Sequence, residues 1–254
     1  MGLEQIQVEL QDCMGSDRRI AEAAWTSSYG QAKQQDKTDE EVARVVRMMA
    51  KSGHGTPFES VVMRFWIRLP IFTDRQHMTH RIATHNGLSG RYRTIPTDYY
   101  DIPDDVQDLF DKASGGDIKE RWTRALGHDA KFCELDLLEM YLNSCEIAAN
   151  NYRMGVNFLK EAEKDKLITN AEFKRVREVW RAQVPVGTMV ERVSIFNLRS
   201  FANYMRHRLS PHAQQEIQQV ARLMLQQVKD KAIAPVALEE LEKQNWILEP
   251  DMPT

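Results

Sequence analysis

The sequence is poor in cysteine, and its few cysteines show no pairing pattern. Cys13, Cys133 and Cys145 are an odd number in 254 residues, and no two have CxxC spacing. This spacing predicts neither a disulfide framework nor a zinc site, and it favours a reducing compartment. The amino-terminal segment has no basic head or apolar run of the kind that a signal peptide needs. We therefore expect a cytoplasmic protein.

Long apolar runs and an excess of positive charge are missing as well. Mean hydropathy is −0.53, and no stretch is apolar over a membrane-spanning length, so no membrane association is predicted. Lys+Arg total 34 against 37 for Asp+Glu, which gives a net charge of −3. Sequence-independent binding of a nucleic-acid polymer needs a basic excess and is not expected. The 42% of hydrophobic residues are enough to bury a core.

The spacing of hydrophobic residues predicts a helix-rich α/β protein with a modest sheet. Alternating patterns predict strands over 6–10, 60–70 and 188–196. Helical spacing predicts helices over 18–28, 38–52, 71–81, 117–166, 171–183, 197–209 and 212–231. The acidic, turn-rich residues 98–116 are expected to form a surface connection.

Several helix ends carry capping signals. Thr38 and Glu41 have the spacing of a capping box, and Asn170 is a good N-cap for the helix that follows it. Ser210 and Pro211 predict the start of the next long helix. The tail after Pro235 is expected to be a loosely attached helix.

Arginine is concentrated in two short windows. Residues 75–97 contain four arginines and no acidic residue, and residues 181–208 contain five with one acidic residue. Clustered guanidinium groups suit bidentate capture of phosphate, although each arginine could equally belong to an ion pair on a solvated helix face. Arg199, Asn203 and Arg206 share one face of a predicted helix, and such a polar stripe can line a ligand cavity or face solvent.

The histidines do not predict a metal site. His54, His77, His80 and His85 are close in sequence, but no HExxH motif or nearby carboxylate accompanies them. The sequence also lacks the GxSxG elbow of a serine hydrolase. We therefore expect neither a metal centre nor hydrolase chemistry.

The segment THRIATHNGLSGRY, residues 79–92, resembles the signature of the flavin-dependent thymidylate synthases, the ThyX family. Four other segments are similar to blocks of that family and follow one another in the family's order: 53–59, 70–76, 179–185 and 197–217. The resemblance covers nearly the whole chain and is weakest over 98–170 and after 232.

The resemblance implies a fold, a reaction and an assembly. The expected fold is α/β (α+β), with helices packed around an antiparallel sheet. The reaction is reductive methylation of dUMP to dTMP, with methylenetetrahydrofolate as carbon donor, FAD as redox carrier and NADPH as reductant. A homotetramer with active sites between subunits is expected. We predict one catalytic domain over 1–232, with a helical insertion at about 105–165, and an extension over 233–254.

The resemblance also implies the site residues. Those expected to contact FAD are Thr56, Thr79, His80, Arg81, Gly87, Asn197, Leu198, Arg199 and Asn203. Those expected to hold the nucleotide are Gln76, His77, Met78, Thr79, Gly87, Leu88, Ser89, Gly90, Arg91, Arg181 and Arg208. Arg208 is the expected catalytic residue and would favour the N3-deprotonated uracil. Its chemistry fits this role, because arginine keeps its proton and stabilises charge developing on the pyrimidine. Ser89 as a nucleophile is an alternative, but no base is apparent beside it.

Two positions depart from the family pattern. Thr79 stands where the signature begins with arginine, and Gly87 stands where glutamate is usual. Three interpretations follow: an active synthase in which neighbours such as His77 or His85 compensate, a relative that modifies another pyrimidine nucleotide (dCMP, or transfer of a hydroxymethyl group), or an impaired enzyme. A non-catalytic nucleotide-binding protein on the same scaffold is a further hypothesis.

Overall fold

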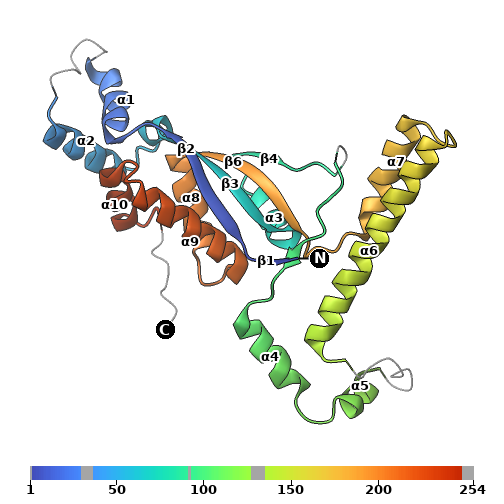
Figure 1. The fold of residues 1–254 in the computed structure, drawn as a ribbon. Helices are drawn as coiled ribbons and strands as arrows, with labels where there is room; N and C mark the ends of the chain where they lie inside the picture. The colour runs from blue at the N-terminus through green and yellow to red at the C-terminus, as the bar shows by residue number, and fades with distance from the viewer. Residues whose placement is uncertain (1, 30–36, 91–92, 127–134, 248–254) are drawn as a thin grey trace. The chain divides into compact units, whose positions relative to one another are not determined.

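A computed structural model describes residues 2–29, 37–90, 93–126 and 135–247 (Figure 1). The chain forms two compact units, which we call the sheet unit, residues 6–87 with 190–254, and the helical unit, residues 1–5 with 88–189. The boundary predicted near residue 233 falls inside the sheet unit. A single catalytic domain over 1–232 stays a prediction.

The sheet unit is built on four strands in the order β2-β3-β6-β4. Their bounds are Gln7–Met14 for β2, Val62–Pro70 for β3, Thr84–Gly87 for β4 and Met189–Asn197 for β6. Strand β2 pairs antiparallel with β3, and β4 pairs antiparallel with β6. Met63, Phe65 and Ile67 alternate along β3 and are fully buried, because successive side chains of a strand point to opposite faces. The sequence did not predict β4.

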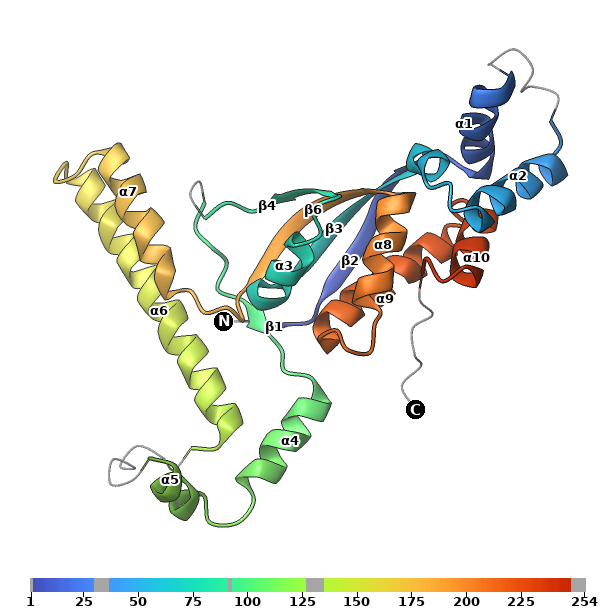
Figure 2. The same cartoon turned by 180° about the vertical axis from the view of Figure 1, so that it is seen from behind.

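Helices α3, α8 and α9 pack close to this sheet (Figures 1 and 2). The helices of the unit are α1 Asp17–Tyr29, α2 Asp39–Lys51, α3 Ile71–Met78, α8 Leu198–Arg208, α9 Gln215–Asp230 and α10 Pro235–Lys243, with a 3-10 turn at Thr56–Ser60. Aromatic rings join sheet and helix: Phe65 of β3 stacks on Phe201 of α8 with centroids 6.0 Å apart, and Phe196 lies 5.3 Å from Tyr204. This core fixes α8, which carries the predicted site residues Leu198, Arg199, Asn203 and Arg208.

The described residues of the helical unit form a short parallel pair, β1 Leu3–Glu4 with β5 Tyr99–Tyr100, and four helices. The helices are α4 Asp104–Ser114, α5 Ile118–Leu126, α6 Leu137–Lys164 and α7 Asn170–Trp180, and a 3-10 turn follows at Arg181–Gln183. Helices α6 and α7 pack side by side (Figures 1 and 2). In the described part of the chain, no helix combines the length and apolar character that crossing a membrane requires.

The capping box of α2 is confirmed, since Thr38 and Glu41 each bind the other's backbone N–H. Two other start signals are wrong. The N-cap of α7 is Thr169, one residue before Asn170. Helix α9 begins at Gln215, because the Ser210 carbonyl accepts from the Ala213 N–H in a separate turn.

Two further expectations are corrected. The segment 98–116 is not merely a connection, because it contains strand β5 and helix α4. The described part of the tail, residues 235–247, is not loosely attached: Ala237 and Leu241 of α10 are fully buried, and α10 packs against α2. Composition suggested exposed turns and a loose tail, but packing against the rest of each unit orders both.

Candidate active site

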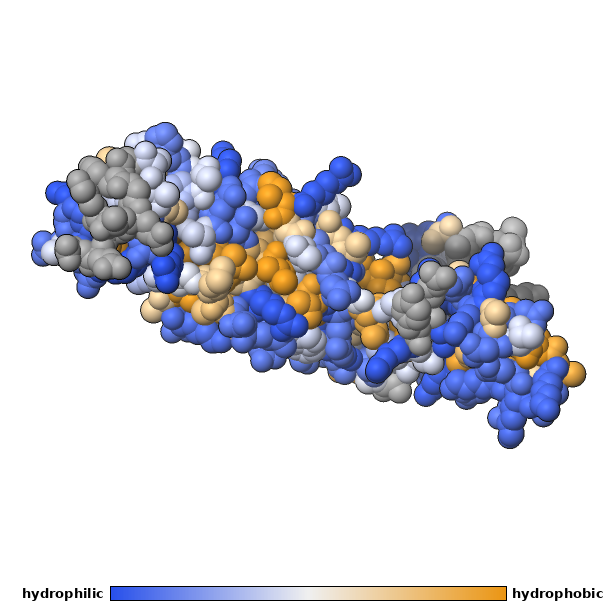
Figure 3. Space-filling view, turned by 90° about the horizontal axis from the view of Figure 1, so that it is seen from above, coloured by the Kyte–Doolittle hydropathy of each residue, from blue (hydrophilic) through white to orange (hydrophobic). Residues whose placement is uncertain are grey.

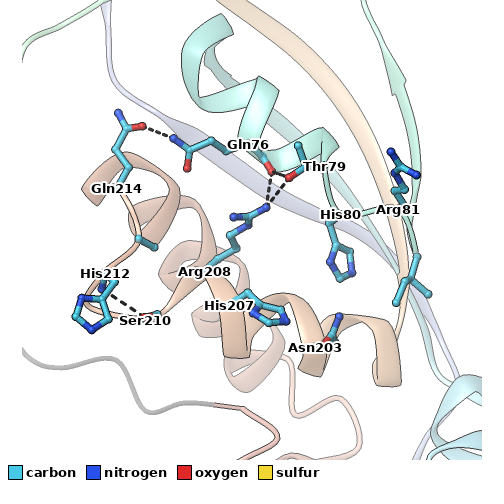
Figure 4. Close-up of a pocket in the computed structure, with 12 residues that line it drawn as sticks. Gln76, Thr79, His80, Arg81, Asn203, His207, Arg208, Ser210, His212 and Gln214 are labelled. Carbon is cyan, nitrogen blue, oxygen red and sulfur yellow. Dashed lines mark hydrogen bonds between the residues drawn. The ribbon is translucent and has the colours of Figure 1, made fainter.

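A cavity of about 810 Å³ lies in the sheet unit between the end of α3, the end of α8 and the turn that leads to α9 (Figure 4). Its lining includes six of the predicted site residues: Gln76, Thr79, His80, Arg81, Asn203 and Arg208. The sequence blocks 70–76, 79–92 and 197–217 therefore meet here. Parts of the chain that are more than one hundred residues apart in sequence form one site.

Arg208 is held at this cavity by two acceptors at the C-terminal end of α3, one in its last turn and one at its C-cap. Its Nη2 donates to the Gln76 carbonyl and to the Thr79 hydroxyl, each at 2.7 Å (Figure 4). The guanidinium also lies 6.0 Å from the ring centroid of Tyr204. Its Nε is buried and has no hydrogen-bond partner within the described residues. A cation held in a fixed position with donor capacity left over suits an anionic or carbonyl-bearing ligand.

Thr79 therefore has a definite task although it departs from the family signature. Its hydroxyl donates to the Gln76 carbonyl at 2.7 Å and accepts from Arg208. We expect Thr79→Val, which keeps the shape but removes the hydroxyl, to lower kcat/KM roughly five- to tenfold, because a charge-assisted hydrogen bond is lost. Thr79→Ser should retain activity. Steady-state kinetics test this, and wild-type values for the valine variant would contradict the role.

A chain of four hydrogen-bonded side chains lies behind the cavity wall, three of them fully buried and the fourth, His85, half-buried. His85 Nε2–H donates to the His80 carbonyl at 3.1 Å, so the neutral Nδ1 of His85 accepts from Ser194 at 2.9 Å. Ser194 then accepts from His77 Nε2–H, and His77 Nδ1 accepts from the Tyr204 hydroxyl, both at 2.8 Å. Because the carbonyl can only accept, every donor direction follows from this one bond.

His77, His80 and His85 are held in the neutral form. Burial lowers the pKa of His77 far below its usual range, with smaller contributions from the nearby charges of His85 and Arg192. Burial also lowers the pKa of His85, and that of His80 to about 4. His80 Nε2–H donates to Ser200 at 3.0 Å, and Ser200 donates to the Ile82 carbonyl at 2.8 Å.

These lowered pKa values predict a loss of stability in mild acid. Below pH 6.5 these histidines become protonated in the unfolded chain but stay neutral in the folded protein. Protonation therefore stabilises the unfolded state, and the free energy of unfolding falls as pH drops from about 6.5 towards 4. We expect a fall of more than about 1 kcal/mol between pH 7 and pH 5, measured by urea unfolding. His85→Gln should flatten this dependence, and the exposed His54→Gln should not. A pH-independent wild type would contradict it.

Gly87 packs against a buried ion pair. Arg192 binds Asp74 through two bonds, Nε to Oδ1 at 2.5 Å and Nη2 to Oδ2 at 2.6 Å. A Cβ added at Gly87 would lie 3.1 Å from Arg192 Nη2. Arg192 Nη2 also lies 3.0 Å from the sulfur of Met78. Gly87 thus leaves room for the arginine at the position where the family usually has glutamate.

A second cavity, of about 540 Å³, adjoins the first along α8. Ile82 and Asn203 line both cavities, and Asn197 and Arg199 line the second. Asn197 caps α8 by accepting from the Ser200 N–H at 2.8 Å. Arg199 binds Glu59 at 2.8 Å, and it can pass there because residue 55 is glycine: a Cβ would lie 2.7 Å from Arg199 Nε. The predicted polar stripe of α8 therefore lines cavities.

Other predicted residues of the sheet unit lie away from these two cavities. His77 and Leu198 are fully buried, and His85 is half-buried with both ring nitrogens occupied, so neither histidine side chain compensates by lining the site. Thr56 lines a different cavity, of about 620 Å³, between α1 and α2. Met78 is exposed and, like Gly87, does not line either cavity along α8.

The remaining predicted residues belong to the helical unit. Gly90 is buried, and a Cβ placed there would lie 2.8 Å from Ile95 and 3.5 Å from the Cδ of Arg181. Gly90 and the exposed Arg181 are therefore neighbours, as a shared phosphate site requires. Leu88 is exposed and Ser89 is half-buried. Arg91 lies outside the described residues.

The structure adds residues that the sequence patterns did not indicate. Those lining the main cavity are Ile82, His207, Ser210, His212, Ala213 and Gln214, and those lining the second are Glu59 and Trp246. The signal for His207 was available, because it lies one turn after Asn203 on the same helix. Gln214, which hydrogen-bonds Gln76, lies in a turn without such a periodic signal.

A family model described as thymidylate synthase complementing protein matches residues 9–236. The chain belongs to this family. The resemblance stated from the sequence blocks is thereby confirmed. Membership of this thymidylate synthase family makes the chain an enzyme of the methyltransferase class.

Several relatives of the thymidylate synthase complementing protein family are similar over most of the chain. The flavin-dependent thymidylate synthase of Treponema denticola is 30% identical over 237 residues, which cover 93% of this chain and 79% of that protein. That of Pseudothermotoga lettingae is 30% identical and covers 87% and 84%. The crystal structure of the UMP/dUMP methylase PolB from Streptomyces cacaoi with 5-Br dUMP has a TM-score of 0.71 at 25% identity, covering 97% and 99%. This likeness confirms the helix-rich fold around a small antiparallel sheet.

Proposed function

We propose that this protein catalyses the reductive methylation of dUMP to dTMP, with methylenetetrahydrofolate as carbon donor, FAD as redox carrier and NADPH as reductant. The observation that carries the proposal is the fixed position of Arg208, in a cavity built from the three sequence blocks that resemble the family. The names of the relatives, flavin-dependent thymidylate synthases and a UMP/dUMP methylase, support both the flavin and the uridine nucleotide.

The residues along α8 fit a flavin dinucleotide. Asn203 is half-buried between the two cavities, and its amide makes no hydrogen bond to a described residue. Arg199 supplies a cation to the second cavity, and Gly55 leaves room for its side chain. An amide pairs with the donors and acceptors of a flavin ring, and a guanidinium pairs with a diphosphate. When bound, FAD would carry the reducing equivalents from NADPH.

Arg208 is the residue to which we assign the pyrimidine chemistry. Methylation requires C5 of uracil to become nucleophilic, which places negative charge on the ring. The Arg208 guanidinium would stabilise the N3-deprotonated form, because arginine stays protonated at any working pH. The side chains described around the main cavity include no cysteine whose thiolate could activate the uracil ring by covalent attack. In the proposed reaction the Arg208 cation serves this purpose by stabilising the charge on the ring.

A direct assay tests the proposal. The purified protein should bind FAD, and with NADPH and methylenetetrahydrofolate it should convert dUMP to dTMP, identified by chromatography. A protein that takes up no FAD would refute the proposal. A protein that oxidises NADPH without forming dTMP should be assayed for hydroxymethylated products and with dCMP. Binding of dUMP without any turnover would favour the non-catalytic alternative.

UMP is a second candidate substrate, favoured by one specific observation. PolB, described as a UMP/dUMP methylase, has been solved with 5-Br UMP as well as 5-Br dUMP, and the UMP-analogue complex covers 98% of this chain at a TM-score of 0.68. The likeness extends through the helical unit, where the sequence resemblance is weakest. Competition between UMP and dUMP in one reaction, with both products measured, decides the preference.

Self-association into a homotetramer is also a proposal. Helix α6 exposes Ile147, Met154 and Phe158, at spacings of seven and four residues that place them on one face. Hydrophobic side chains also appear among hydrophilic ones at the surface in Figure 3. An exposed apolar stripe of this kind suits an interface between copies of the chain. Sedimentation should give the mass of four chains, and a monomer at working concentrations would contradict this assembly.

A further inference from the structure

Trp246 is an aromatic residue at the second cavity that the sequence blocks did not indicate. It lies beyond residue 236, where the match to the family model ends. Nevertheless its side chain lines the cavity together with Arg199 and Asn203, two residues expected to contact FAD. The tail after α10 therefore reaches the proposed cofactor site.

The backbone holds this tryptophan in place. Asn245 has a positive φ of 56°, a conformation that asparagine tolerates and that commonly ends a helix. The N–H groups of Trp246 and Ile247 both donate to the Leu241 carbonyl, at 2.8 and 3.2 Å. Ile247 is fully buried and anchors the chain directly after the indole. Position 246 is thus fixed from both sides.

The indole itself is only partly used by the protein. Its ring lies 5.9 Å from that of Phe58 with the planes tilted by 51°, and the residue is half-buried. The indole N–H makes no hydrogen bond to any residue that the structure describes. An aromatic face and a free donor beside the Arg199 guanidinium form a combination that recognises a flat heteroaromatic ring.

We propose that Trp246 is a further cofactor-binding residue, which packs against one of the planar rings of FAD at the second cavity. This inference rests on the proposed function, because it requires FAD to bind along α8. The adenine and isoalloxazine rings of FAD are both flat and heteroaromatic, so an indole can pack against either one. The test must therefore distinguish which of the two rings Trp246 contacts.

Titration of the apoprotein with FAD and with FMN tests the inference. We expect Trp246→Leu, which keeps apolar bulk without the π face, to weaken FAD binding roughly tenfold, and Trp246→Phe to weaken it less than about threefold. Melting of the apoproteins should show that both variants fold. Quenching of tryptophan emission on FAD binding should drop sharply in Trp246→Phe but not in Trp66→Phe, a control at a residue that lines neither cavity.

The outcomes separate this inference from the proposed function. If FMN affinity falls in parallel with FAD affinity in Trp246→Leu, the indole contacts the isoalloxazine. If only FAD affinity falls, it contacts the adenine. Unchanged affinity for both, with quenching retained, would overturn the inference alone. A wild-type protein that binds no FAD would instead overturn the proposed function.

Discussion

Replacing Arg208 with alanine should lower kcat for dTMP formation by at least about 100-fold, while the protein still binds FAD. The guanidinium is held by the Gln76 carbonyl and the Thr79 hydroxyl, so its charge lies at one position in the cavity. Alanine removes that charge without adding bulk. The two measurements are the rate of dTMP formation and the absorbance of bound flavin.

Two further variants make this test specific. Arg208→Lys keeps a positive charge but lacks the planar guanidinium, whose Nη2 donates to both acceptors, so its rate should lie between those of wild type and alanine. Arg75→Ala is a matched control, because Arg75 is exposed on α3 next to Gln76 and does not line the cavity. Its rate should stay within about threefold of wild type. Turnover retained by Arg208→Ala would remove the assigned role.

Replacing Asp74 with asparagine should lower the free energy of unfolding by about 3–5 kcal/mol. The substitution hardly changes the shape of side chain 74, but it leaves the charge of Arg192 buried and without a partner, because each of the two side chains is only 9% exposed. An unpaired buried cation costs more than the intact pair contributes. Urea unfolding at pH 7 measures the change.

A double variant separates the effect of losing the ion pair from the effect of leaving one buried charge unpaired. Asp74→Leu combined with Arg192→Met removes both charges and should recover much of the loss seen in Asp74→Asn. Asp108→Asn is the control, because Asp108 is exposed, and its stability should change by less than about 0.5 kcal/mol. A loss below about 1 kcal/mol in Asp74→Asn would show that the pair is not what fixes this region.

The sequence predicted a helix or strand well where its local pattern of residues favoured one structure only. The alternation along 60–70 predicted strand β3, and the capping box at Thr38 fixed the start of α2. Local patterns failed where two readings compete over a few residues. Ser210 and Pro211 have good capping chemistry, yet they form a turn before α9. Strand β4 is only four residues long, and THNG has no alternation to reveal it.

The candidate site was predictable in its membership more than in its geometry. Six predicted residues line the main cavity, because the blocks around Gln76, His80 and Arg208 carried the resemblance. His77 and His85 do not take the place of the side chains that the family usually has at positions 79 and 87, because both ring nitrogens of each histidine are engaged in hydrogen bonds. Sequence spacing cannot show whether a histidine faces a cavity or a buried hydroxyl.

The sequence by itself determined that cysteines are few and that no basic excess and no long apolar run are present, and it determined the five blocks and their order. The tertiary structure alone decided which distant groups meet. Arg208 reaches the Gln76 carbonyl across 132 residues, and Arg192 reaches Asp74 across 118. Periodicity assigns a residue to a face of its own helix or strand, but the partner of that face depends on how the elements pack. Trp246 lies at the proposed cofactor site for this reason, although no local pattern marked it.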